Sequence, residues 1–391
     1  MKLPTENKFF KNLIILLFML FSVDIFGMGW YIFGGAVGLL IIYMLMVDKK
    51  LTLSPLFAWV TLLALTNFLI LNYHSNADIV TKVIKYLLSP IGAFVLGTQL
   101  AKDEEEANGI MKLYMIAVIP YLIHGILNIS IFNGFDEYER MVTDYWTGQK
   151  WNATLACTYF AMTVPLCFNA FICKGFLKKI LYLGATAVSI YASFITASRT
   201  VVIIGLLVIL MEFWLYIKEK ADFAKKIKNV ALFLIVVMIV AGVVIGNMEN
   251  LSTTNFFGRM TNNDMSEEPR IQLFMNIIEN CWAYPFGNMP YFYSHNTWLD
   301  FLRESGWITF ICFMAITIIC VRHIVSIFKN KHISQEYRLA VVGMMTALLL
   351  DMFVEPMMDG AAILFCLFFY FIGVNSVYAE KKELTEEKQD V

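Results

Sequence analysis

The feature that most constrains this chain is a series of apolar runs long enough to cross a lipid bilayer. A membrane-spanning helix needs about 20 consecutive, mostly apolar residues, and such runs recur along most of the 391 residues. Hydrophobic residues make up 59% of the sequence and charged residues 16%, against about 45–50% and about 25% in soluble domains. The sequence therefore predicts an all-α, polytopic integral membrane protein.

The apolar runs predict about twelve transmembrane helices within a single transmembrane domain, residues 1–378. The first helix is expected to be retained, because no convincing small-residue cleavage site follows the N-terminal apolar run. The charged residues 379–391 are expected to form a disordered cytoplasmic tail. The predicted spans lie near residues 10–26, 29–47, 53–72, 83–100, 110–132, 153–173, 180–197, 200–217, 230–247, 305–323, 338–355 and 361–378.

The basic residues indicate how the chain is oriented in the membrane. With the N-terminus in the cytoplasm, 22 of the 30 lysines and arginines lie on the cytoplasmic side, which agrees with the positive-inside rule. Both termini are then cytoplasmic, and the protein is expected in the cytoplasmic (inner) membrane. The other eight basic residues lie outside: Lys82, Lys85, Arg140, Lys150, Arg199, Arg259, Arg270 and Arg303.

Arginine is concentrated on the outer side. Five of the seven arginines lie there, but only three of the 23 lysines. A guanidinium group holds phosphate or carboxylate through two parallel hydrogen bonds and keeps its proton at every physiological pH. We therefore predict an outward-facing anion site. The alternative is chance combined with structural ion pairs to outer acids such as Asp136 and Glu267.

Two polar stretches make up most of the outer surface, residues 133–152 and the long extracytoplasmic loop 248–304. A loop of the second length is usually functional. Within it, Arg270 opens a segment whose apolar residues follow helical spacing, which predicts a short amphipathic helix lying on the membrane. An irregular arm, residues 284–293, then leads back to the membrane.

His295 stands where this loop re-enters the membrane. Thr297 and Asp300 form a capping-box pattern, which predicts that a helix starts there. The imidazole would lie at the helix N-terminus, where the dipole disfavours its protonated form and favours nearby anions. We interpret His295 as a candidate general base. The alternative is a histidine that only caps or orients the helix.

Other polar residues lie near predicted span ends. Arg199, in the sequence A-S-R-T, is expected at the outer rim of the bundle, either in a site or extended to the lipid headgroups. Asp351, Glu355 and Asp359 recur one helical turn apart. The two aspartates are expected to pair with outer arginines, whereas for Glu355 both that role and the orientation of a sugar stay open.

Four further polar residues are assigned structural roles. His124 and Asn128 are expected to satisfy each other or a backbone carbonyl, and Asp24 and Glu212 are expected to be solvated. The sequence contains no CxxC pair, no outer DxD motif, no GxxxxGK[ST] loop and no HExxH motif. We therefore expect no cofactor and no bound metal, so that arginine would have to neutralise any leaving anion.

Several motifs resemble those of the O-antigen polymerase/O-antigen ligase superfamily. His295-Asn296 is followed at the family's spacing by Gly306, and Arg270 precedes P-F-G at 285–287. The A-S-R-T at 197–200 and W-N-A-T-L-A at 151–156 resemble the family's outer arginine and its asparagine-containing entry to a span. Ligases often continue with a second glycine, whereas this chain reads G-W-I-T-F at 306–310. This difference favours the polymerase group.

The resemblance implies a glycosyltransferase that joins undecaprenyl-pyrophosphate-linked oligosaccharides on the outer face of the membrane. One lipid-linked chain would be the donor and another the acceptor, and flippase and chain-length regulator proteins are candidate partners. His295 would accept the proton of the attacking hydroxyl, and Arg199 and Arg270 would hold the donor pyrophosphate, with inversion at the sugar and without metal. Second-rank candidates are Asn152, Asn296, Arg303, Glu355 and Arg259.

Two other readings compete with a polymerase of O-antigen or capsule type. A ligase would move finished glycan to a lipid or protein acceptor, and acceptor choice lies in loop shape. A transporter or flippase of lipid-linked glycan would be expected to have inverted repeats, interrupted helices and charged residues near the membrane midplane. The sequence shows no clear repeat and few such charges, which disfavours this hypothesis. Nucleic acid is not expected as a partner.

Overall fold

The computed structural model describes residues 4–48, 54–74, 78–101, 118–129, 135–136, 141–196, 198–218, 227–228, 230–231, 269–290 and 294–386. In these residues eight helical segments are long and apolar enough to cross a membrane. This confirms the predicted class, a helical membrane protein. Most of the predicted span 230–247, the start of the predicted span 110–132, and residues 248–268 of the predicted loop 248–304 lie outside the described residues. The last helix continues to Glu386, so residues 379–386 of the predicted disordered tail are helical, and residues 387–391 lie outside the described residues.

The N-terminal part of the chain contains helices that mostly follow the predicted spans. Asp24 closes the first tight turn, because its carboxylate accepts a hydrogen bond from the backbone N–H of Gly29 at 2.8 Å. The elements are α1 (Pro4–Ser22), η1 (Ile25–Gly27), α2 (Gly29–Tyr43), η2 (Met44–Asp48), α3 (Pro55–His74), α4 (Ile79–Lys82), η3 (Val83–Leu88), α5 (Ser89–Ala101) and α7 (Ile119–Ile129).

A small antiparallel sheet follows within the polar stretch 133–152. It consists of β1 (Phe135–Asp136), β2 (Met141–Thr143) and β3 (Lys150–Asn152), in the order β1-β2-β3. The turn between β2 and β3 is closed by the Asp144 side chain, which accepts hydrogen bonds from the backbone N–H groups of Trp146 and Thr147. The sequence does not predict this sheet, because its strands are too short to show a period of two.

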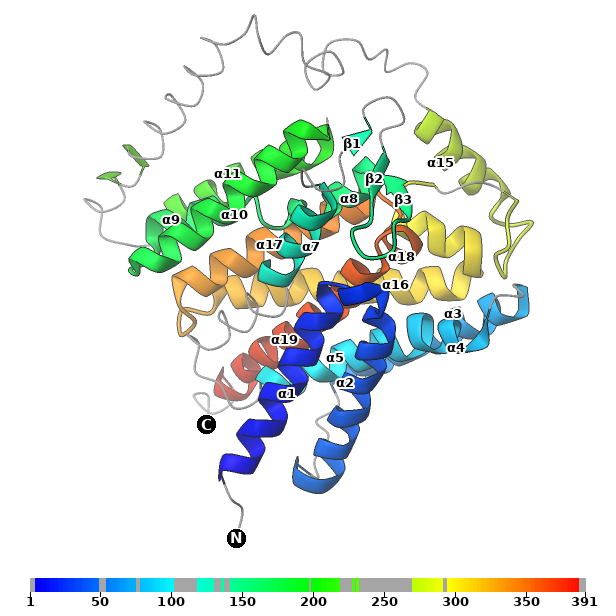
Figure 1. The fold of residues 1–391 in the computed structure, drawn as a ribbon, viewed down its shortest axis with the longest axis horizontal. Helices are drawn as coiled ribbons and strands as arrows, with labels where there is room; N and C mark the ends of the chain where they lie inside the picture. The colour runs from blue at the N-terminus through cyan, green and yellow to red at the C-terminus, as the bar shows by residue number, and fades with distance from the viewer. Residues whose placement is uncertain are drawn as a thin grey trace, which may run out of the picture.

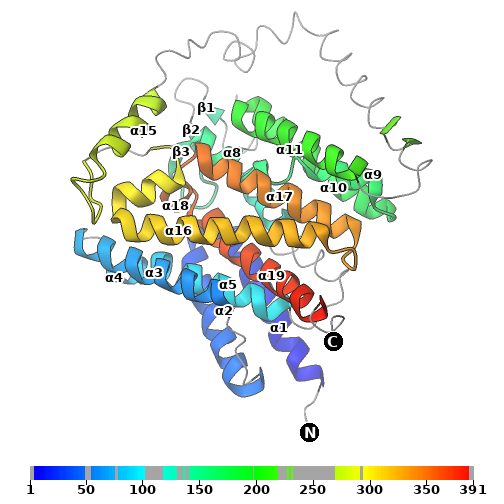
Figure 2. The same ribbon diagram turned by 180° about the vertical axis from the view of Figure 1, so that it is seen from behind.

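The remaining elements form the centre and one side of the bundle. Figures 1 and 2 show α16, α17 and α19 running through the middle of the molecule, between the α10–α11 pair and the helices α3 to α5. These elements are α8 (Ala153–Ala161), α9 (Leu166–Ile172), α10 (Phe176–Ile195), α11 (Arg199–Lys218), α15 (Pro269–Asn280), α16 (Thr297–Lys329), α17 (Gln335–Val354), α18 (Met357–Gly360) and α19 (Ala362–Glu386).

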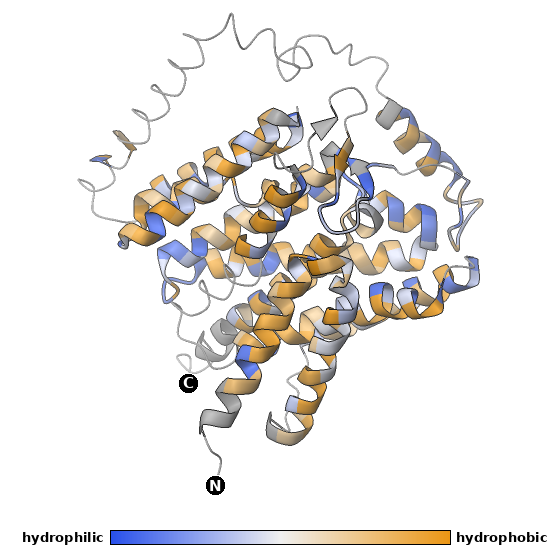
Figure 3. Ribbon diagram, viewed as in Figure 1, coloured by the Kyte–Doolittle hydropathy of each residue, from blue (hydrophilic) through white to orange (hydrophobic). Residues whose placement is uncertain are grey.

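Close packing of α19 against α5 holds the centre of the bundle. A Cβ atom added at Gly97 would meet the backbone of Tyr370 and Val374, and one added at Gly373 would meet the backbone of Phe94. Small residues at such positions let two helix backbones approach, which is how helices pack where lipid supplies little hydrophobic drive. Apolar residues cover most of the helices, with hydrophilic ones gathered toward their ends (Figure 3).

Glu212 is an exception to this polarity pattern and corrects the prediction that it is solvated. The residue is only 1% exposed and lies on α11, where its carboxyl group packs against Gly343 of α17. The prediction placed Glu212 near a span end, whereas α11 turns this position toward the neighbouring helix. Among the described residues neither carboxyl oxygen of Glu212 has a hydrogen-bond partner, and such burial of an acid is expensive in an apolar bundle.

Candidate active site

The helix α16 begins at Thr297, as predicted, but its N-cap differs from the prediction. Asn296 is the N-cap, and its side-chain oxygen accepts a hydrogen bond from the backbone N–H of Leu299 at 3.0 Å. Thr297 is already helical, and its hydroxyl donates to the carbonyl oxygen of Glu355 at 3.0 Å. Asp300 instead accepts a hydrogen bond from the backbone N–H of Ser294 at 2.9 Å. The capping-box assignment of Thr297 and Asp300 is therefore wrong.

His295 occupies a strained backbone conformation directly before this helix. Its φ of 55° is in the left-handed region, which non-glycine residues adopt rarely and which is enriched at functional sites. The neighbouring residues fix this conformation. Asn296 donates from its side-chain amide to the carbonyl oxygen of Phe353 at 3.1 Å, and the Ser294 hydroxyl donates to the carbonyl oxygen of Asn296 at 2.8 Å.

The imidazole of His295 lies against the carboxyl group of Glu355. His295 Nδ1 is 3.6 Å from Glu355 Oε2, and the two side chains are 32% and 1% exposed. About a third of the His295 side chain is thus exposed, while Nδ1 faces a buried acid. Glu355 was a second-rank candidate with an open role, and the structure brings it to His295.

Glu355 is carried by the C-terminal end of α17. Its backbone N–H donates to the carbonyl oxygen of Asp351 at 2.9 Å, which is the last hydrogen bond of that helix. Asp351 is 1% exposed, and neither of its carboxyl oxygens has a hydrogen-bond partner in the part of the chain that the structure describes. The predicted pairing of Asp351 with an outer arginine is therefore not observed, and the side chain of Asp359 lies outside the described residues.

A sharp kink at Gly306 sets the direction of the first turns of α16. Gly306 has φ 75° and ψ −168°, a combination open to glycine alone. The kink leaves some backbone N–H and C=O groups of α16 without partners within the helix. The P-F-G turn at residues 285–287 and the two residues after it supply those partners. The Trp307 N–H donates to the carbonyl oxygen of Pro285 at 3.0 Å, and the Asn288 and Met289 N–H groups donate to the carbonyl oxygens of Glu304 and Arg303. Two motifs of the sequence resemblance thus form one structural unit.

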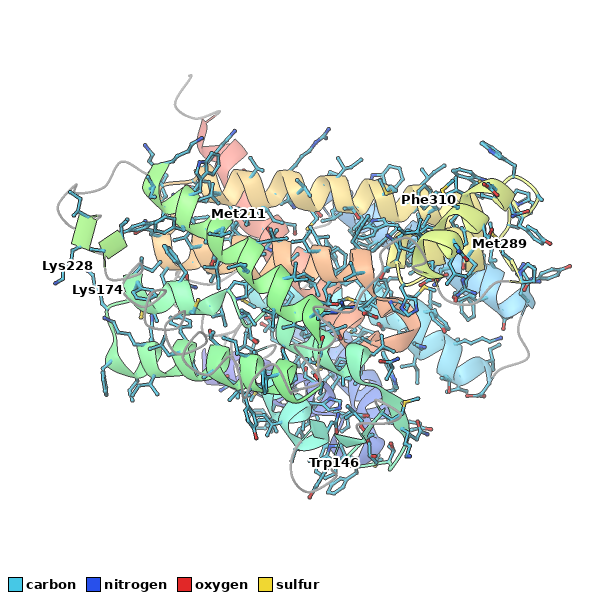
Figure 4. The ribbon with its side chains drawn as sticks, turned by 90° about the horizontal axis from the view of Figure 1, so that it is seen from above. Trp146, Lys174, Met211, Lys228, Met289 and Phe310 are labelled. Atoms are coloured by element: carbon cyan, nitrogen blue, oxygen red, sulfur yellow. The ribbon has the colours of Figure 1, made fainter. Side chains whose placement is uncertain are left out.

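A small apolar cluster joins α15 to the start of α16. Ile277, Cys281, Met289 and Leu302 are buried together, with Phe310 packed against them. Figure 4 shows Met289 and Phe310 at the same end of the molecule, with Lys174 and Lys228 at the opposite end. α15 therefore buries one of its faces against the start of α16, and its predicted position on the membrane surface stays a prediction. Arg270 is the second residue of α15, and its side chain lies outside the described residues, as does Arg259.

Arg199 and Arg303 differ in their surroundings. Arg199 is the first residue of α11 and is partly exposed. The turn before it is joined to α8, because Thr196 Oγ1 lies 2.7 Å from Cys157 Sγ, and Figure 1 shows this turn at the end of the bundle where α16 begins. Arg303 is buried and forms ion pairs with Asp300, at 3.2 Å, and with Glu304. Arg303 therefore serves the local structure.

Asn152 lies at the end of β3, immediately before α8. Its side chain is exposed, and the adjoining α8 contacts α18 where Leu155 packs on Gly360. The entry to the span is therefore near the segment that follows Glu355. The structure brings His295, Asn296 and Glu355 together directly, and places Arg199 and Asn152 on separate elements at the same end of the bundle.

A second polar cluster ties the small sheet to the first helices. His124 Nδ1 lies 3.3 Å from the carbonyl oxygen of Ser22, and its Nε2 lies 3.6 Å from Asp144 Oδ2. Asn128 accepts a hydrogen bond from the backbone N–H of Tyr145. The expected backbone carbonyl is present, but Asp144 was not predicted. Burial alone would raise the pKa of Asp144, yet the neighbouring His124 imidazole and the hydrogen bonds from Thr147 outweigh it and lower the pKa to about 2.

Comparison with known proteins adds no family. No protein-family model matches the chain, and no curated protein matches it. The resemblance described above therefore rests on the motif residues themselves.

Proposed function

We propose that this protein is a bacterial polysaccharide polymerase that joins undecaprenyl-pyrophosphate-linked repeat units on the outer face of the cytoplasmic membrane. The full proposal includes about twelve spans, cytoplasmic termini and the long extracytoplasmic loop 248–304. The observation that carries it is the contact between His295 and Glu355 at a helix N-terminus, with Nδ1 3.6 Å from the carboxylate. A partly open imidazole backed by a buried acid is suited to general-base catalysis.

His295 would act directly on the acceptor sugar. With Nδ1 facing Glu355, the other ring nitrogen, Nε2, would take the proton from the attacking hydroxyl. The hydroxyl oxygen forms a bond to the anomeric carbon of the donor while the bond from that carbon to the pyrophosphate oxygen breaks. Attack from the opposite face inverts the anomeric centre. Glu355 would hold the ring in place and offset the charge of the imidazolium that forms.

The leaving pyrophosphate would be held by arginine. Arg199 begins α11 at the same end of the bundle as His295, and Arg270 lies in the first turn of α15. Guanidinium groups can hold the phosphate oxygens and offset their developing charge. We therefore expect polymerisation to proceed without added divalent metal.

The decisive experiment supplies purified protein with lipid-pyrophosphate-linked repeat units and follows the product on a gel. A polymerase gives a ladder of glycans, a ligase gives product only with a different acceptor, and a transporter moves substrate across proteoliposomes without elongation. His295→Ala is expected to lower the rate by about 10²–10⁴-fold, the usual contribution of a general base.

A matched control is His332→Ala, because His332 is exposed in the loop between α16 and α17. That variant should polymerise at the wild-type rate. A His295→Ala protein that inserts normally and makes the full ladder would remove the assignment of His295. Glu355→Gln is expected to lower kcat with little effect on KM, because Glu355 touches the histidine and not the bulk of the substrate.

A further inference from the structure

Asp351 lies one helical turn below Glu355 and takes no part in the mechanism so far. Residues four apart in a helix have Cβ atoms about 5–6 Å from each other on the same face. Glu355 is the C-cap of α17, and its N–H still donates to the carbonyl oxygen of Asp351 at 2.9 Å, which keeps it one turn beyond Asp351. Both residues are 1% exposed. The two carboxyl groups are therefore buried neighbours.

We infer that Asp351 is a positioning residue for His295: it keeps its proton and donates a hydrogen bond to the Glu355 carboxylate, so that the pair presents a single negative charge to the imidazole. This inference rests on the proposed function. It assigns different tasks to two neighbouring acids, one as a neutral donor and one as the charged partner of the histidine.

The burial of Asp351 supports a neutral carboxylic acid. A buried carboxylate without a cation or hydrogen-bond donors is strongly disfavoured, and in the described part of the chain neither Asp351 oxygen has a hydrogen-bond partner. Two adjacent buried carboxylates also repel each other, so that one of them retains a proton. Glu355 is the member that faces His295, and the charge therefore belongs on Glu355.

Among the described residues of the helices that contact α17, two further buried acids have other neighbours. On α16, Asp300 is already ion-paired with Arg303. On α11, Glu212 packs against Gly343, about two helical turns from Asp351. A hydrogen bond from Asp351 to Glu355 would fix which Glu355 oxygen faces His295.

The test compares an amide with an apolar side chain at position 351. Asparagine keeps a hydrogen-bond donor without charge, so Asp351→Asn should keep kcat close to the wild-type value. Asp351→Leu removes the donor and should lower kcat by about 10–100-fold, the cost typical of losing a group that orients a functional residue, with KM unchanged. Equal losses for Asn and Leu, or no loss for Leu, would overturn the inference.

Glu212 offers a matched control, since it is equally buried and lacks a hydrogen-bond partner among the described residues. Glu212→Gln and Glu212→Leu should have the same kcat as each other. Folding of each variant is checked by its elution as a single species and by its thermal unfolding midpoint. These measurements separate a loss of positioning from a general loss of structure.

Infrared spectroscopy tests the proton without any turnover. In a Glu212→Gln background, the carbonyl stretch of a protonated carboxylic acid should be present at neutral pH and should disappear when Asp351→Asn is added. Absence of that difference would show that Asp351 is charged and would refute the inference. An active His295→Ala protein would refute the proposed base while leaving the infrared result intact, so the two failures can be told apart.

Discussion

The kink at Gly306 provides the sharpest test of how this site is built, and the perturbation is Gly306→Ala. At φ 75° and ψ −168° an alanine is strained by about 1–3 kcal/mol. Its Cβ would also run into the carbonyl oxygen of Pro285 and the backbone nitrogen of Gly287. These are backbone atoms of a tight turn, so they cannot move aside as a flexible side chain would.

The expected magnitude follows from what must be lost for the alanine to fit. Separating the two segments breaks the hydrogen bond from Trp307 N–H to Pro285 O, which contributes about 0.5–1.5 kcal/mol net. Together with the backbone strain, the change should destabilise the protein by about 1.5–4.5 kcal/mol. Because the kink aims the first turns of α16, His295 should also move relative to Glu355, and kcat should fall.

Thermal unfolding in detergent and the polymerisation assay measure the two effects. Gly184→Ala is the control, because Gly184 lies within α10 and an added Cβ there would have nothing within 4 Å. That change should be neutral or should stabilise by about 0.5–1 kcal/mol, as alanine does in a helix. A Gly306→Ala protein with wild-type unfolding and wild-type kcat would refute the role of the kink.

Three further changes test individual contacts. For Asp144, the folded pKa of about 2 lies below the ordinary 3.8, so its stabilisation is present above pH 3.8 and is lost as the pH falls through about 2. Asp144→Asn should therefore lower the free energy of unfolding by about 2 kcal/mol at pH 7 and by about half of that at pH 3. An equal decrease at both pH values would contradict this prediction. Asn296→Ala should lower the free energy of unfolding by about 1 kcal/mol, because the N-cap of α16 is lost, and should also lower kcat. Asn296→Ser should restore the cap but not kcat. Wild-type unfolding of the Asn296→Ala protein would contradict the role of the cap. Tyr182→Phe removes a 2.6 Å hydrogen bond to Glu336 and should cost about 1.5–3 kcal/mol, whereas Tyr191→Phe at an exposed position should cost nothing measurable in thermal unfolding.

The sequence by itself determined the helical membrane class and many of the helix positions. An apolar run long enough to span a bilayer has to form a helix, because backbone polar groups find no other partners in lipid. The start of α16 at Thr297 was also predicted correctly, although from a capping box of Thr297 and Asp300 that the structure does not form. These features depend on residues within a few positions of one another, which is why the sequence displays them.

Only the tertiary structure decided which distant residues meet. His295 contacts Glu355, which lies 60 positions along the chain, and the P-F-G turn docks on Gly306 through backbone hydrogen bonds. The burial of Glu212 and the partnership of His124 with Asp144 likewise depend on which helix face turns inward. Helix packing fixes those faces through contacts across the whole bundle, and an apolar span shows little periodicity from which to read them.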